Sequence, residues 1–306
     1  QAPGLETSFG NGGMIQAEAA EPYAFPRRFG TVAKIALGLS NDVKWRWSAI
    51  PSHWRPLLSY FRHSAPEAHA RISRVYALLT GAATRDQGAL IEAAGSDNLI
   101  QKDGFRQIFR SARALDRAAA EAERVFASYG VRSRVQTEGE LADQEPGLRT
   151  RLAGAVHWLD TWSCRDPGEL VASYVRLFQH RGGRFARGDA NSLRQRGNRW
   201  IVDCEGGVIE GAAAVIALGP WSAQLLARYG YKVPLFAKRG YHRHYAISQG
   251  PRLPIHDTEN GIFFAPMVRG LRICTGAELT RFGAAPSSAQ LDRGERVVSE
   301  LYRLGE

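Results

Sequence analysis

The stretch ETSFGNGGMIQAE, residues 6–18, combines two hydroxyl side chains with three glycines and ends in a short apolar run. Thr7 and Ser8 offer hydroxyl groups, and the three glycines between positions 10 and 13 offer backbone amides that no side chain shields. Successive unshielded amides can hold a pyrophosphate or the edge of an aromatic ring through hydrogen bonds. From these residues alone, a ligand-binding loop and a flexible tail of small residues are both open interpretations.

The composition is that of an ordinary globular protein. The 306 residues are 44% hydrophobic and 23% charged, and no apolar run approaches the roughly 18 residues that a membrane helix needs. The net charge of +10 is spread along the chain, and no nucleic-acid-binding motif accompanies it, which argues against a nucleic-acid partner. The segment WRWSAIPSHWR, residues 45–55, mixes aromatic and basic residues, but its proline and the spacing of its tryptophans indicate packing. Weak attraction to an acidic lipid surface fits the charge better.

The three cysteines predict no metal or redox site. Cys164, Cys204 and Cys274 lie far apart in the sequence and lack the paired spacing that such sites use. A sparse, odd number of cysteines is typical of buried thiols in a reducing compartment. We therefore expect a cytoplasmic location.

Two helices are well marked. In QIFRSARALDRAAAEAERVFASYG, residues 107–130, apolar residues recur every three or four positions up to Gly130, which suits a left-handed C-terminal cap. In the second helix, Asp166 is placed to cap the N-terminus and Pro167 to occupy the first turn. Gly182 follows where that helix should end.

The second half of the chain is rich in strand patterns. Residues 199–211 alternate and turn back on themselves, which predicts a hairpin. The run AAAVIAL, residues 212–218, is continuously apolar and predicts a parallel strand buried on both faces. Short strands with turn signals between them predict an antiparallel sheet in residues 234–248, 261–268 and 271–279. The expected fold class is mixed α/β, with an α/β layer interleaved with an α+β region.

The opening stretch extended to residue 26, ETSFGNGGMIQAEAAEPYAFP, resembles a loop of the flavin-dependent D-amino-acid oxidase and glycine oxidase family, closest to its D-amino-acid dehydrogenase branch of the small-subunit type. Further landmarks of the family follow in order over nearly the whole chain, and their order makes the resemblance specific. They are EGELADQEPGL (138–148), GGRFARGDANSL (182–193), AAAVIALGPWSAQLL (212–226), PLFAKRGYHRHYAI (234–247) and ICTGAEL (273–279).

The resemblance implies a Rossmann-like FAD-binding domain interleaved with an antiparallel-sheet substrate domain. Residues 1–25 and 162–224 would form part of the FAD-binding domain, and residues 26–161 and 225–306 the substrate-binding domain. In the family a GxGxxG turn precedes the opening loop, and a GLRP-type segment comes late. Neither occurs here. The resemblance therefore implies a fragment of a longer flavoenzyme, truncated at both ends.

The resemblance also implies roles for individual residues. The cofactor FAD would be contacted by Thr7, Ser8, Asn11, Gly12, Gly13, Met14, Asn191, Ala217, Gly219 and Trp221. Tyr241, Phe263 and Leu279 would lie on the substrate side, facing the flavin. His242 and His244 should share one face of a strand, away from Tyr241, and a metal site would need a third ligand beside them, so we expect no metal.

The implied reaction is oxidation of a D-amino acid, or of another small amine with a carboxylate, to an imine, followed by release of a 2-oxo acid and ammonia. The dehydrogenase branch passes electrons to a membrane quinone. The resemblance thus implies peripheral contact with the inner face of the bacterial inner membrane. Two alternatives stay open: a glycine or sarcosine oxidase-like enzyme that uses oxygen, and an inactive chain that needs further segments to bind FAD.

Overall fold

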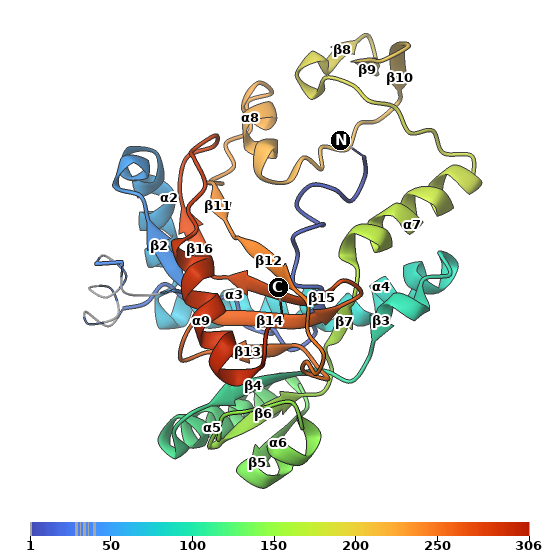
Figure 1. The fold of residues 1–306 in the computed structure, drawn as a ribbon. Helices are drawn as coiled ribbons and strands as arrows, with labels where there is room; N and C mark the ends of the chain where they lie inside the picture. The colour runs from blue at the N-terminus through green and yellow to red at the C-terminus, as the bar shows by residue number, and fades with distance from the viewer. Residues whose placement is uncertain are drawn as a thin grey trace.

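The computed structural model describes residues 2–27, 30, 32, 35, 37–38 and 41–305. Its largest sheet consists of β4 (Phe105–Phe109), β5 (Ser133–Thr137), β6 (Gly154–Trp158), β12 (His242–Tyr245), β13 (Ile255–Asp257), β14 (Ile262–Met267) and β15 (Gly270–Thr275). The strand order is β12-β15-β14-β13-β4-β6-β5, and the pairs are antiparallel except that β13 and β4 run parallel. Two distant parts of the chain thus form one sheet in the body of the molecule (Figure 1).

The two faces of this sheet are covered differently. Helix α9 (Ala289–Leu301) packs on one face against apolar residues such as Ile273 of β15, and we call this the α9 face. Side chains alternate along a strand, so Arg272 and Phe263 point to the opposite face. There they meet residues 9–13 of the N-terminal loop, and we call this the loop face.

A second apolar core lies where α5 (Ala112–Tyr129) packs against β4 and β6. The helix ends as predicted at Gly130, whose φ of +73° is the left-handed conformation that glycine favours. Its start differs from the prediction, because Phe109 belongs to β4 and not to the helix. Ile108 and Phe109 are buried in different cores, and an extended strand is the conformation that sends neighbouring side chains to opposite faces.

Helix α7 (Pro167–His180) confirms the second predicted helix. The Asp166 side chain accepts a hydrogen bond from the backbone N–H of Glu169 at 3.0 Å, which satisfies a donor that the helix itself leaves free. The structure also describes the helices α2 (Ile50–His63), α3 (Pro66–Gly81), α4 (Ala83–Ala93), α6 (Glu138–Gln144) and α8 (Ser222–Ala227). Within the described part of the chain, every helix is too short or too polar to cross a membrane.

Three smaller sheets have three strands each. They are β1 (Met14–Ile15), β7 (Trp162–Cys164) and β3 (Ile100–Gln101); β10 (Gly207–Gly211), β9 (Arg199–Cys204) and β8 (Arg194–Arg196); and β11 (Lys238–Arg239), β16 (Ala277–Leu279) and β2 (Val43–Trp45). The pair β9–β10 confirms the predicted hairpin. In Figure 1 the β8–β10 sheet and α8 stand apart from the seven-stranded sheet, and the N-terminal segment runs between them and that sheet. The mixed fold with an antiparallel sheet is confirmed.

The prediction of a buried parallel strand at residues 212–218 is wrong. Among the described residues, no strand pairs with the segment, and Val215 is 91% exposed. A strand needs backbone hydrogen bonds to a neighbour, and an apolar sequence does not supply that neighbour. The segment instead connects β10 to α8 and borders the cavities described below.

Candidate cofactor site

A cavity of about 610 Å³ brings together residues from three distant parts of the chain. Thr7 and Ser8 come from the N-terminal loop, and Trp221 comes from the turn before α8. Asn191 comes from a turn that precedes β8. The volume lies within the range of about 300–1,000 Å³ that small-molecule and cofactor sites occupy. Six of the residues predicted to bind the cofactor line it: Thr7, Ser8, Asn191, Ala217, Gly219 and Trp221.

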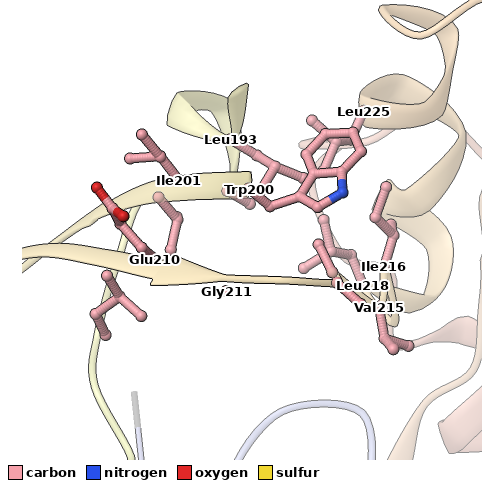
Figure 2. Close-up of a pocket in the computed structure, with 14 residues that line it drawn as sticks. Leu193, Trp200, Ile201, Glu210, Gly211, Val215, Ile216, Leu218 and Leu225 are labelled. Carbon is pink, nitrogen blue, oxygen red and sulfur yellow. The ribbon is translucent and has the colours of Figure 1, made fainter. Parts of the chain in front are cut away.

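An apolar cavity of about 320 Å³ adjoins the first and shares Ala190, Leu218 and Leu225 with it. Figure 2 shows its lining, which includes Trp200 of β9 and Leu225 of α8. The polar cavity beside the N-terminal loop therefore continues into an apolar one beside the β9–β10 hairpin. This arrangement suits a ligand that is polar in one part and aromatic in another.

Hydrogen-bonding groups converge on the polar cavity. Thr7 and Ser8 each offer a hydroxyl group, and Asn191 offers an amide. Glu6 offers a carboxylate, which can accept hydrogen bonds from hydroxyl groups. Gly219 has a φ of +55°, so a side chain at this position would strain the backbone. This set of groups matches phosphate oxygens and sugar hydroxyls.

The other four predicted loop contacts lie against the sheets. A Cβ at Gly12 would stand 2.7 Å from the Phe263 ring, so glycine permits the loop to approach β14 closely. Gly13 has a φ of +79° and donates its backbone N–H to the Asn11 side chain at 2.8 Å. Met14 begins β1, which pairs with β7. The loop thus borders the cavity with one half and rests on the sheets with the other.

The residues predicted on the substrate side lie in two places. Phe263 is on the loop face, beneath Gly12. Tyr241 precedes β12, and its hydroxyl donates a hydrogen bond to Glu278 at 2.5 Å. Leu279 is buried in β16, directly after Glu278. Their roles toward a substrate remain predictions, but the Tyr241 hydroxyl already has a protein partner.

Glu278 is the centre of a buried hydrogen-bond network. Burial alone would raise its pKa, but the hydrogen bonds that it accepts from Tyr241 and Arg46 outweigh burial and hold the pKa of this carboxyl below its ordinary value. The Tyr241 hydroxyl also accepts a hydrogen bond from the backbone N–H of Ser287 at 3.1 Å. The network joins β16 to the segment before α9, which is a structural role.

The loop face carries basic side chains that the sequence analysis did not bring together. Arg272 Nε donates to His244 Nε2 at 3.1 Å, and Arg272 Nη1 donates to the Asn11 backbone carbonyl. The His242 ring meets the edge of the Phe9 ring, with centroids 5.8 Å apart. The alternating Leu-Arg-Ile-Cys sequence of β15 is the signal that separates Arg272 from the apolar α9 face.

The two histidines share one face, as predicted, with ring centroids 6.0 Å apart. Burial lowers the pKa of both His242 and His244, and the positive charge of Arg272 lowers it further. Both rings are therefore neutral near pH 7, which leaves His244 able to accept the hydrogen bond from Arg272. Among the described residues, no three potential metal ligands cluster anywhere. Burial raises the pKa of the neighbouring Cys274 thiol to about 12, so that thiol stays protonated.

This chain is similar to known proteins along nearly its whole length. The family model described as FAD dependent oxidoreductase matches residues 1–304. The D-amino-acid oxidase of Bradyrhizobium diazoefficiens is 30% identical over 291 residues, covering 93% of this chain and 68% of that protein. A D-amino acid dehydrogenase of Cereibacter sphaeroides is 28% identical over 312 residues, covering 98% and 70%. The glycine oxidase from Geobacillus kaustophilus shares the fold, with a TM-score of 0.62 and 19% identity over 96% of this chain and 68% of that chain.

Proposed function

Because this chain belongs to the family of FAD-dependent oxidoreductases, we propose that it oxidises D-amino acids, or related small amines with a carboxylate, to 2-oxo acids and ammonia. The D-amino-acid oxidase and the D-amino acid dehydrogenase that align with most of the chain support this substrate class. The observation that carries the proposal is the cavity where Thr7, Asn191 and Trp221 meet, since it joins the segments expected to hold the cofactor.

The residues of the two cavities fit FAD. The hydroxyl groups of Thr7 and Ser8 suit phosphate oxygens, and the Glu6 carboxylate suits the hydroxyls of a sugar or ribityl chain. Trp221 and Trp200 offer flat apolar surfaces to the cofactor's ring systems. FAD, when bound, takes up the hydride that leaves the α-carbon of the substrate.

The chain's own contribution is to bind and orient the substrate and to exclude water. We assign cofactor binding to residues 1–25 and 162–224, and substrate binding to residues 26–161 and 225–306. In this assignment Phe263 supplies an apolar surface on the loop face. Its ring already packs closely under the N-terminal loop, which keeps water from that part of the face.

We propose a membrane quinone as the electron acceptor, with peripheral contact between the protein and the cytoplasmic face of an anionic membrane. The net charge of +10 supports this contact. So does α2, where the exposed side chains of Trp54 and Leu58 accompany Arg55 and Arg62. Binding to vesicles with and without anionic lipid tests this part: sedimentation with anionic vesicles alone is expected, and no sedimentation with either would contradict it.

Oxygen is the second candidate acceptor, and the 30% identity to a D-amino-acid oxidase favours it. The two candidates differ in the product of reoxidation, because oxygen would yield hydrogen peroxide and a quinone would not. Turnover with a quinone analogue and no peroxide supports the dehydrogenase. Peroxide formed in step with 2-oxo acid supports the oxidase.

The reaction itself is tested by mixing the flavin-loaded protein with single amino acids in the absence of oxygen. We expect D-amino acids to bleach the visible flavin absorption and their L-enantiomers to leave it unchanged. Equal bleaching by both enantiomers, or by neither, would contradict the proposed substrate class. Quantifying the 2-oxo acid after reoxidation checks that the bleaching reflects oxidation at the α-carbon.

A further inference from the structure

Arg272 is a buried cation without an acidic partner. Its residue is 4% exposed, and within the described ranges no carboxylate oxygen lies within 4.0 Å of its guanidinium. Burying an unpaired charge is costly because the charge loses its hydration, so a position that keeps one needs a reason. Burial also lowers the pKa of this guanidinium, while the charge of Asp166, which lies beyond 4.0 Å, acts in the opposite direction.

The contacts of Arg272 all lead to the N-terminal loop and to β12. Nη1 donates to the Asn11 backbone carbonyl, and Nε donates to His244. The guanidinium carbon lies 5.8 Å from the centre of the Phe9 ring, within reach of a cation–π interaction. A hydrogen bond from a charged donor is roughly twice as strong as one between neutral groups. The cation therefore anchors the loop at Asn11.

This anchor reaches the cofactor cavity through hydrogen bonds within the loop. The backbone N–H of Asn11 donates to the Ser8 carbonyl at 3.1 Å, and that of Phe9 donates to the Glu6 carbonyl at 3.1 Å. The Asn11 side chain in turn accepts from the N–H of Gly13. One residue, Asn11, thus joins the half of the loop that rests on the sheets to the half that lines the cavity.

We propose that Arg272 is a positioning residue that holds residues 7–13 in the conformation that binds FAD. Its role is to fix where the Thr7 and Ser8 hydroxyls and their backbone point, without touching the reacting atoms. The inference rests on the proposed placement of FAD beside Thr7 and Ser8. It adds a residue on β15, far away in the sequence, on which cofactor affinity depends.

The experiment compares three substitutions in the full chain. Arg272→Met removes the charge and the donors but keeps much of the side-chain volume, and Arg272→Lys keeps the charge without the fork of donors. Arg269→Met is the matched control, because the guanidinium carbon of the exposed Arg269 lies 5.9 Å from the centre of the same Phe9 ring. Two readouts are recorded: hydrogen–deuterium exchange of the amides of residues 9–13, and FAD affinity from quenching of flavin fluorescence.

We expect Arg272→Met to speed exchange of the loop amides and to weaken FAD binding, each by about tenfold or more. Arg272→Lys should lie in between, and Arg269→Met should stay within about twofold of the wild type. A folded Arg272→Met protein with unchanged FAD affinity would overturn the proposal, whether or not the loop amides exchange faster.

Gly10→Ala perturbs the same loop while keeping the guanidinium, and it is the second test if Arg272→Met does not fold. A Cβ at Gly10 would stand 2.6 Å from the His242 ring, so the loop or that ring must shift, and the amide exchange of residues 9–13 shows whether the loop has moved. Weaker FAD binding by a variant with altered loop exchange supports the proposal, and unchanged FAD binding despite altered loop exchange contradicts it. If the wild type itself binds no FAD, the proposed cofactor placement fails, and the exchange data alone then show whether Arg272 holds the loop.

Discussion

Two buried arginines on opposite faces of the seven-stranded sheet have very different surroundings. Arg106 of β4 lies on the α9 face and is 3% exposed, while Arg272 of β15 lies on the loop face and is 4% exposed. Arg106 forms an ion pair with Glu145 and donates to Gln136 at 2.9 Å and to Gln144 at 2.6 Å. Arg272 instead donates hydrogen bonds to the ring of His244 and to the backbone carbonyl of Asn11.

The difference separates a stabilising cluster from a positioning one. The donors of Arg106 are satisfied by side chains that belong to β5, to α6 and to the segment after it, so the cluster fastens these elements to the sheet. The donors of Arg272 are satisfied by a loop that borders the candidate cofactor cavity. We expect changes at Arg106 to act on stability and changes at Arg272 to act on cofactor binding.

The largest effect is expected from Arg106→Met, which leaves the Glu145 carboxylate buried without its cation. Such a change should lower the free energy of unfolding by about 3–5 kcal/mol. Urea denaturation followed by circular dichroism measures it. A double variant, Arg106→Met with Glu145→Leu, is the control, because removing both charges should restore most of the loss. If the single variant lost less than about 1 kcal/mol of unfolding free energy, the stabilising role assigned to Arg106 would be contradicted.

Tyr241→Phe tests a second satisfied network. The substitution removes the hydrogen bond to the buried Glu278 carboxylate and should cost about 1.5–3 kcal/mol of unfolding free energy. If Tyr241 serves stability alone, kcat and KM for a D-amino acid should change little in the folded variant. A large fall in kcat at unchanged stability would instead support the predicted substrate-side role of this residue.

Arg272→Met should be less costly to stability than either of these changes. The lost hydrogen bonds are partly offset by relief from burying an unpaired cation, so we expect a cost of about 1 kcal/mol. The same denaturation measurement applies, now beside the loss of FAD affinity proposed above. A cost as large as that of Arg106→Met would show that both arginines are structural.

The smallest expected effect is a dependence of folding stability on pH. The pKa values of His242 and His244 in the folded protein lie below the ordinary value of about 6.5. The unfolded chain therefore binds more protons just below that pH, and stability should fall as the pH drops from about 6.5 through the folded-state values. The partly buried His157 and His256 also have pKa values that burial lowers, and they should add to the slope.

His244→Gln tests how much one histidine ring contributes to the pH dependence of stability. Glutamine can still accept the hydrogen bond from Arg272 but does not titrate, so melting temperatures of this variant should depend less on pH between 7 and 5 than those of the wild type. An unchanged slope would show that His244 does not contribute. Exposed His180 is the matched control, and His180→Gln should leave the slope as it is.

Local signals in the sequence predicted the local parts of the fold. Asp166 and Gly130 mark helix ends through hydrogen bonds and backbone conformations that involve only a few neighbouring residues. The hairpin of β9 and β10 is local in the same sense. The order of family landmarks also brought Thr7, Asn191 and Trp221 into one predicted site, and the cavity that they share is consistent with it.

The predictions that were wrong or missing concern structure that depends on residues far away in the sequence. Phe109 fits a helical pattern, but β4 forms because β13, nearly 150 residues later, pairs with it. Residues 212–218 have the composition of a buried strand and lack a neighbouring strand within the described ranges. Arg272 was not singled out, because the absence of an acidic partner shows only once the loop and the sheet are placed together.

The central claim is that FAD binds in the cavity beside Thr7 and Ser8. A titration of FAD followed by its visible absorption tests it most directly, in the wild type, in Ser8→Trp and in the control Ser128→Trp, whose site is exposed on α5 far along the chain from the cavity-lining residues. We predict that the wild type and the control bind FAD alike and that Ser8→Trp binds it at least about tenfold more weakly, because the indole fills the cavity. Equal binding by all three proteins, or by none of them, would contradict the claim.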